Sequence, residues 1–159
     1  MPYTQLYYHV VWATKNRAPF ITPEAEPLIY NFLRSKAIGL GAIVYAMNGL
    51  HDHVHLVVAI PAKIAVAKFI GQVKATATAR FNKSGHPHAP IYWQSEYAVF
   101  STDKKRLPYH IRYVERQKQH HSEGGLIPIL ERIDGANQSR VRESQVAYHP
   151  DTTADWIPE

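Results

Sequence analysis

Residues 42–60 read AIVYAMNGLHDHVHLVVAI, and this stretch decides the fold. It contains two runs rich in β-branched and other apolar residues, at 42–47 and 52–60, and such runs are typical of strands. Between them lie Asn48 and Gly49, a pair that favours a turn. The stretch therefore predicts two consecutive strands that run in opposite directions.

The segments on either side of this pair alternate between extended and helical patterns. The expected elements, in chain order, are a strand at 3–13, a helix capped by Thr22 that ends near Gly39, the two strands, a helix at 62–82, a strand within 91–101 and a helix at 103–121. The order βαββαβ followed by one more helix predicts an α+β protein. Its fold class is a ferredoxin-like or RRM-like split βαβ arrangement, with an antiparallel sheet and an additional C-terminal helix.

The composition is that of one globular domain. The chain has 159 residues, of which 45% are hydrophobic, enough for a single core. It has no cysteine, which excludes disulfides and thiolate metal sites. The N-terminus lacks the pattern of a signal peptide, and no stretch approaches the roughly 18 apolar residues of a membrane span. We therefore expect a cytoplasmic protein that does not contact a membrane.

The charges are unevenly distributed along the chain. Residues 63–119 hold 11 of the 18 lysines and arginines and only three acidic residues, a net charge of +8. From Ser122 onward the balance reverses to −4. A basic middle and an acidic tail favour a polyanion as the partner of the middle segment. A solvated, lysine-rich surface is the alternative explanation of the same charges.

The second strand of the pair carries three histidines. Because side chains two positions apart on a strand point to the same side, His51, His53 and His55 are expected to share one face, with Asp52 on the other. Neighbouring imidazoles such as those of His53 and His55 could hold one divalent cation. The alternative is a pair of sheet histidines that bond to backbone or carboxylate groups.

The last predicted helix contains LPYHIRYVERQKQHH at 107–121. Tyr113 and Gln117 are four positions apart and so lie one turn apart on one helix face. This face borders a narrow apolar stripe formed by Leu107, Ile111 and Val114. The alternative is a packing tyrosine whose hydroxyl lies in water. Three other histidines of this helix are expected to be solvated: His110, His120 and His121. The alternative is that they touch DNA phosphates or the outer shell of the metal.

Several of these segments, in this order, resemble the small single-tyrosine HUH transposases of bacterial insertion sequences and their REP-associated relatives. The matching segments are HVH at 53–55, YVERQ at 113–117, the strand at 93–101 and HVVWATKNR at 9–17. The resemblance covers most of residues 3–121. It implies a transposase domain at 3–121, followed by an acidic, partly irregular tail at 122–159.

The resemblance also implies roles for individual residues. His53, His55 and Gln117 would bind a divalent metal, Mg²⁺ or Mn²⁺, and Tyr113 would be the nucleophile. The implied reaction cuts and rejoins single-stranded DNA, at element ends that carry hairpins, through a 5′-phosphotyrosine. The implied assembly is a homodimer. Tyr92 and Trp93 are candidates for stacking on bases, and the basic residues expected to contact DNA are Lys74, Arg80, Lys104, Lys105, Arg112 and Arg116.

Two other functions remain open from the sequence. The three alternating histidines are similar to those of histidine-triad nucleotide hydrolases, but Asp52 breaks that alternation and Tyr113 and Gln117 would have no role. The βαββαβ order also fits a non-catalytic, RRM-like module that binds nucleic acid. The aromatic and glycine pattern usual on the central strands of such modules is missing here.

Overall fold

The sheet consists of four antiparallel strands in the order β2-β3-β1-β4. A computed structural model describes residues 2–133 of the chain, and the other residues lie outside the description. The strands are β1 (Tyr7–Ala13), β2 (Ile43–Leu50), β3 (His53–Ala59) and β4 (Ala98–Thr102). The predicted split βαβ fold with an antiparallel sheet is confirmed.

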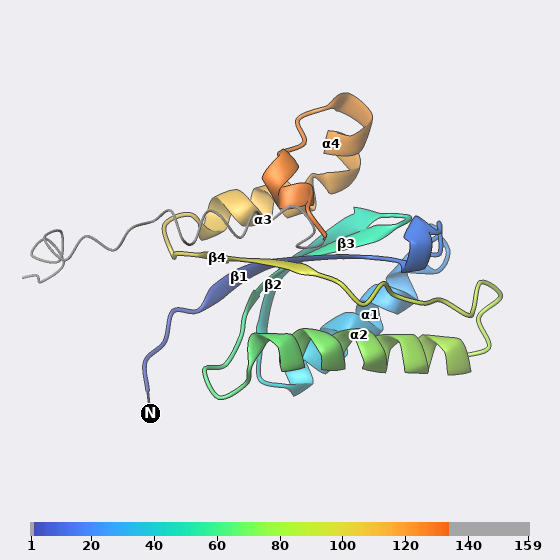
Figure 1. Cartoon of the computed structure of the whole chain (residues 1–159), viewed down its shortest axis with the longest axis horizontal. Coiled ribbons are helices and arrows are strands. Elements are labelled where there is room, and N and C mark those ends of the chain that lie inside the picture. The colour runs from blue at the N-terminus through green and yellow to red at the C-terminus, as the bar shows by residue number, and fades with distance from the viewer. Residues whose placement is uncertain (1, 134–159) are drawn as a thin grey trace, which may run out of the picture.

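The helices cover both faces of the sheet (Figure 1). Helices α1 (Glu26–Gly39) and α2 (Val66–Lys83) lie side by side on one face. Helices α3 (Leu107–Glu115) and α4 (Gln117–Glu123) lie on the other face, as the figure shows above the sheet. Two short 3₁₀ helices complete the elements, η1 (Lys15–Arg17) and η2 (Pro128–Glu131). No helix within residues 2–133 is both long enough and apolar enough to cross a membrane.

The two central strands are buried on both faces, which explains their continuous apolar sequences. Val10, Trp12, Val54 and Leu56 pack against α1 and α2 in the main core. The opposite face of β3 carries Val57, which packs under α3 in a second, smaller cluster. His53 and His55 share the face of Val57 because they alternate with it along β3. The histidine pair therefore lies between the sheet and the helices that follow β4.

The predicted turn at Asn48 and Gly49 is wrong, because both residues belong to β2 and the turn lies at 51–52. Gly49 is opposite Val54, and a Cβ atom on Gly49 would lie 2.1 Å from the carbonyl oxygen of His53. The side chain of Asn48 donates to the carbonyl oxygen of Glu115, 3.0 Å away. The two residues thus serve close strand packing and the end of α3 rather than chain reversal.

Two predicted helix starts are also wrong. Helix α1 begins at Glu26 and α3 at Leu107, and each has a proline in its first turn, Pro27 and Pro108. Proline lacks the amide proton that an interior position of a helix needs, and so it is tolerated only at the start. Thr22 does not cap α1 but accepts a hydrogen bond from the amide of Ala25 within the preceding turn.

The single helix predicted at 103–121 is in fact two helices. The backbone leaves helical geometry at Arg116, which has φ −98° and ψ 15°, and α4 begins at Gln117. This break turns α4 away from the axis of α3 (Figure 1). Gln117 becomes the first residue of the new helix and is fully buried.

Candidate active site

His53 and His55 lie on β3 with their imidazoles buried beneath α3 and α4, at 2% and 0% exposure. A neighbouring group bonds to Nδ1 of each ring. Nδ1 of His53 is 2.8 Å from Oδ1 of Asp52, and Nδ1 of His55 is 2.8 Å from Nε2 of His9 on β1. Each ring therefore has its Nε2 atom left to face the space between the sheet and the helices.

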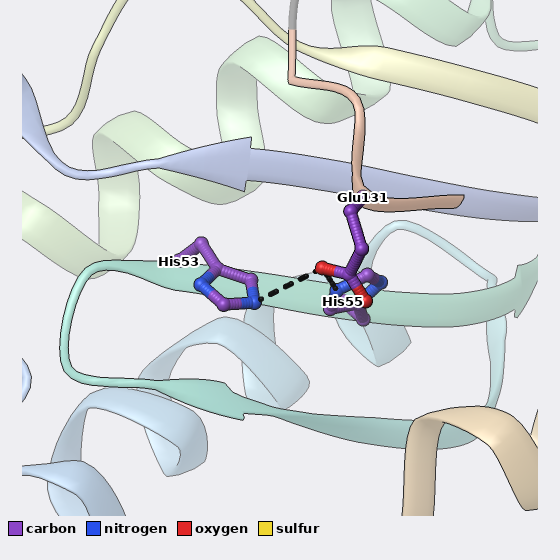
Figure 2. A group of neighbouring side chains, drawn as sticks. All are labelled: His53, His55 and Glu131. Carbon is purple, nitrogen blue, oxygen red and sulfur yellow. Dashed lines mark hydrogen bonds and ion pairs between the residues drawn. The ribbon is translucent and has the colours of Figure 1, made fainter. Parts of the chain in front are cut away.

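Glu131, on η2, joins the two rings (Figure 2). Its Oε2 atom lies 3.1 Å from Nε2 of His55 and 3.5 Å from Nε2 of His53. One ligand atom from each of the three residues lies within 4.8 Å of the others. Two imidazole nitrogens and a carboxylate oxygen that converge in this way are suitable donors for a divalent metal ion.

The side chain of Tyr113 reaches the same cluster from α3. It is only 4% exposed, and its hydroxyl donates to Oε1 of Glu131 at 2.5 Å. The amide of Ile127 donates to the phenolic oxygen at 3.0 Å. The ring centroid of Tyr113 is 6.0 Å from that of His55. The tyrosine thus lies beside the histidine pair of its own chain.

Gln117 is the fourth member of the cluster and is fully buried. Its Oε1 atom lies 3.4 Å from Nε2 of His53, and its amide nitrogen donates to Oε1 of Glu131 at 3.1 Å. Tyr113 and Gln117 therefore share one face, as their spacing predicted, although the helix breaks between them. Both side chains point at the same carboxylate.

The environment holds these groups in defined protonation states. Burial lowers the pKa of both His55 and His9, the latter to about 2, so both rings are neutral at pH 7. Burial alone would raise the pKa of Glu131, but contacts with His55, Tyr113 and Gln117 outweigh it and lower the pKa to about 2. Burial and the bond to Glu131 raise the pKa of Tyr113 to about 12. The cluster therefore combines the neutral imidazole of His55, a carboxylate and a protonated phenol.

The three histidines that were expected to be solvated are all partly buried, two of them against the cluster and His110 against His9, and that prediction is wrong. Nδ1 of His110 is 2.9 Å from Nδ1 of His9, which extends the hydrogen-bonded row from His55 on the sheet to α3. His120 stacks on Tyr113, with ring centroids 5.0 Å apart. Nε2 of His121 is 3.2 Å from Oε1 of Gln117. The helix histidines are thus part of the lining of the site.

His51 does not share the face of the other two strand histidines, contrary to expectation. It lies exposed in the turn before β3, where alternation along the strand does not yet apply. Asp52 lies in the same turn and bonds to His53 instead of pointing to the opposite side of the sheet. The turn therefore supplies a partner for a site histidine.

The basic residues predicted to contact DNA lie in three places. Arg112 and Arg116 are exposed and line a hollow beside Tyr113. Lys104 and Lys105 are exposed just before α3. The two remaining residues are on α2, on the opposite face of the sheet from Tyr113: Arg80 is exposed, and Lys74 is buried with its ammonium bonded to the carbonyl oxygens of Gln94 and Glu96.

Sequence reasoning missed His9 and Glu131. His9 alternates with Tyr8 and Val10 on β1 and so faces the side of the sheet that carries the histidine pair. That alternation could have identified it. Glu131 follows the short apolar run at 126–130, and no spacing relates it to β3 or to Tyr113. Its position depends on how the chain folds back after α4.

Comparisons with known proteins identify the family of the chain. The sequence profile of the family described as "Transposase IS200 like" matches residues 2–117. The ISDra2 transposase TnpA of Deinococcus radiodurans is 26% identical over 119 residues, which cover 71% of this chain and 84% of that protein.

Two solved structures share the fold. A crystal structure assigned as a transposase of Deinococcus radiodurans R1 superposes with a TM-score of 0.58 at 24% identity, and the match covers 73% of this chain and 93% of that one. A REP-associated tyrosine transposase bound to a REP hairpin superposes with a TM-score of 0.57 at 14% identity, covering 100% and 90% of the two chains. Because the family profile spans well over half of the sequence, the chain belongs to the family of IS200-like transposases.

Proposed function

We propose that this transposase cuts and rejoins single-stranded DNA through a 5′-phosphotyrosine formed on Tyr113. One observation carries the proposal. The phenolic oxygen of Tyr113 and the Nε2 atoms of His53 and His55 all meet the carboxylate of Glu131. A nucleophile and a set of metal ligands therefore share one buried cluster within one chain, as metal-assisted phosphoryl transfer requires.

We propose that His53, His55 and Gln117 hold a divalent cation, Mg²⁺ or Mn²⁺. The donor set supports this, because both Nε2 atoms face the cluster and the amide oxygen of Gln117 lies 3.4 Å from one of them. Glu131 adds an oxygen that hard cations prefer. A bound cation would neutralise charge on a non-bridging oxygen of the scissile phosphate.

The residues around Tyr113 control its hydroxyl. With its pKa raised to about 12 and its hydrogen bond donated to Glu131, the phenol stays protonated in the free protein. When a phosphate binds beside the tyrosine, the hydroxyl passes its proton to the carboxylate of Glu131, which already accepts its hydrogen bond, and the phenolic oxygen attacks phosphorus. An oxygen–phosphorus bond to Tyr113 forms and the bond to the 3′-oxygen breaks. That oxygen takes up the proton held by Glu131 and leaves as a free 3′-hydroxyl. Attack by another 3′-hydroxyl reverses these steps and joins new ends.

The surface next to Tyr113 supports DNA as the substrate. Arg112 and Arg116 line the hollow beside the tyrosine, where they can neutralise backbone phosphates. Lys104 and Lys105 extend the positive charge along the start of α3. A single strand is flexible enough to bring its phosphates into such a hollow, whereas the double helix of a duplex is too stiff to follow it. We propose that the ends carry hairpins, since a structural neighbour is described as bound to one.

Covalent capture tests the proposal. Labelled single-stranded DNA from the flanks of the gene is incubated with the protein and Mn²⁺ or Mg²⁺, and a denaturing gel reports the adduct. Wild type should form it, and Tyr113→Phe should not, although it still binds DNA. Tyr109→Phe is the matched control, because Tyr109 lies one turn earlier on α3 and is 48% exposed. An adduct on Tyr113→Phe, or none on Tyr109→Phe, would overturn the assignment.

A further inference from the structure

A groove of about 950 Å³ opens on the side of the sheet that α2 covers (Figure 1) and has no role in the mechanism above. Its walls are η1, the α2 face between Gly71 and Ala79, and the segment 92–95. The groove lies at the end of the sheet where β3 begins, because its wall residue Gln94 bonds to Ala13, the residue of β1 that pairs with His53. The amide of Gln94 donates to the carbonyl oxygen of Ala13 at 2.9 Å.

The groove is lined by cations and, among the described residues, by no acidic side chain. Lys74 is 7% exposed, and its Nζ donates to two carbonyl oxygens at 2.7 and 3.3 Å. Burial lowers the pKa of Lys74 to about 8, so the ammonium is still charged at pH 7. Lys15 and Arg17 add positive charge from η1. A cationic groove of this kind suits the phosphates of a nucleic acid.

Aromatic rings form the other part of the lining. Tyr92 is 49% exposed and is supported from one side by the edge of Phe20, at a centroid distance of 6.4 Å. The ring of Trp93 is fixed by a 3.1 Å hydrogen bond from its Nε1 to the carbonyl oxygen of Lys74. Exposed rings among cations are the pattern that binds unpaired bases by stacking.

The backbone of η1 is held in an uncommon conformation at the rim of the groove. Asn16 and Arg17 have φ of 56° and 55°, a left-handed region that non-glycine residues rarely adopt. Hydrogen bonds to and from Thr14 hold this turn, including 3.1 Å from the amide of Arg17. The turn places the guanidinium of Arg17 3.4 Å from Asp52, the residue that bonds to His53. The rim and the histidine site are thus linked by direct contacts.

We propose that this groove binds the unpaired nucleotides that adjoin the scissile phosphate on the His53 side, with a base on Tyr92 and phosphates near Lys15, Arg17 and Lys74. The inference rests on the proposed function, because it assigns to the groove one flank of the DNA strand that Tyr113 is proposed to cut. It predicts that the enzyme needs a single-stranded flank of a certain length on one side of the cut.

The test compares a groove variant, Lys15→Gln with Tyr92→Ala, with a control that loses the same charge and ring elsewhere, Lys68→Gln with Tyr3→Ala. Lys68 is exposed on α2, and Tyr3 is 84% exposed. Fluorescence anisotropy with labelled oligonucleotides measures affinity in a Tyr113→Phe background, where no cleavage is needed. The groove variant should bind the full-length strand about fivefold or more weakly than the control, which is the loss of one stacked base.

The flank is assigned with two shortened strands, one trimmed on each side of the cleavage site. One of them should bind the groove variant and the control equally, because it lacks the nucleotides that enter the groove. Equal affinity of both variants for the full-length strand overturns the inference. The same difference on both shortened strands also overturns it, since the effect would then not depend on a flank.

A covalent map provides an independent measurement. Full-length strands that carry 5-iodouracil at successive flank positions are irradiated with the complete chain, and mass spectrometry locates the crosslinks. Crosslinks at Tyr92 or Trp93 from one flank are the expected result, and crosslinks that avoid 15–17 and 92–95 contradict the groove assignment. Both measurements stand apart from adduct formation. If wild type formed no adduct on Tyr113, the cleavage proposal would be overturned. The binding and crosslinking measurements would still show whether DNA occupies the groove.

Discussion

His55 is oriented by another imidazole. Its Nδ1 atom bonds to His9, whose other nitrogen bonds to His110 on α3. His53 is oriented differently, by the carboxylate of Asp52. Groups that bond to the second nitrogen of a metal-binding imidazole fix which nitrogen faces the metal. Under the proposed function, His9 would therefore position His55, and Asp52 would position His53.

Replacing His9 should weaken metal binding without unfolding the protein. In His9→Phe the ring volume is kept, but Nδ1 of His55 loses its partner, and we expect the affinity for Mn²⁺ to fall about 10- to 100-fold. Isothermal titration calorimetry measures this, and circular dichroism checks the fold. His88→Phe is the control, because His88 is exposed in the loop after α2. An unchanged affinity in His9→Phe would mean that His55 is oriented without it.

Individual residues of the site differ in how well the sequence predicted them. The pairing of His53 with His55 followed from the alternation of side chains along one strand, β3. The pairing of Tyr113 with Gln117 followed from helical spacing, and the two side chains still meet although Tyr113 lies on α3 and Gln117 on α4. Glu131 was not found because its place depends on a non-repetitive segment after α4. A local pattern therefore predicts partners within an element and says little of partners brought in by a loop.

At the scale of elements, β2 approaches β3 closely at Gly49. The site for a side chain there is filled by the backbone of His53, whose oxygen would lie 2.1 Å from a new Cβ atom. Gly49→Ala should therefore force the two strands apart and lower the free energy of unfolding by about 1–3 kcal/mol. Urea denaturation monitored by circular dichroism measures the change.

Gly39→Ala is the control for that substitution. No atom lies within 4 Å of the Cβ position of Gly39, which is the last residue of α1. Alanine is favoured over glycine in a helix by up to about 1 kcal/mol, so this variant should unfold at the same or a higher urea concentration than wild type. If Gly49→Ala is as stable as Gly39→Ala, the close approach of the strands does not constrain β2.

The element order was predictable, but element ends were less so. Runs of β-branched and other apolar residues located β1, β2 and β3, because such runs reflect burial in the sheet. The pair Asn48 and Gly49 looked like a turn because both residues favour turns in isolation. In the fold, close packing and a bond to Glu115 use them inside β2. Tertiary contacts thus override the local preference of both residues.

At the scale of the whole molecule, β2 and β4 form the two edges of the sheet. Edge strands present backbone groups that can pair with another chain, and we predict a homodimer. Light scattering after size exclusion should give about twice the 18.1 kDa of one chain. The mass of a single chain at every concentration tested would contradict the prediction.

The same dimer allows a test of which chain supplies the tyrosine. Since Tyr113 lies beside the histidines of its own chain, a mixture of Tyr113→Phe and His55→Ala chains should form no adduct. In each mixed dimer, one chain would lack the nucleophile and the other would lack a ligand. Adduct formation by the mixture, with neither variant active alone, would show that the tyrosine crosses to the partner.

Membership in the transposase family argues against the two other functions, a histidine-triad hydrolase and a non-catalytic RRM-like module. The overall architecture was predictable because one split βαβ arrangement satisfies the element order. The break at Arg116 was not predictable, and neither was the return of the chain after α4, which brings Glu131 to the histidine pair. Both depend on contacts between segments that are far apart in the sequence, such as those of Glu115 with Asn48 and of Glu131 with His55.

Among residues 2–133, Glu131 is the last member of the cluster along the chain, and this position has a genetic consequence. A premature stop codon between positions 124 and 130 would spare the coding region of all four strands and of α1 to α4. Under the proposed function, the shortened product would lack the carboxylate and still compete with intact copies for the same DNA ends. A small lesion late in the gene would thus turn the enzyme into an inhibitor of its own element.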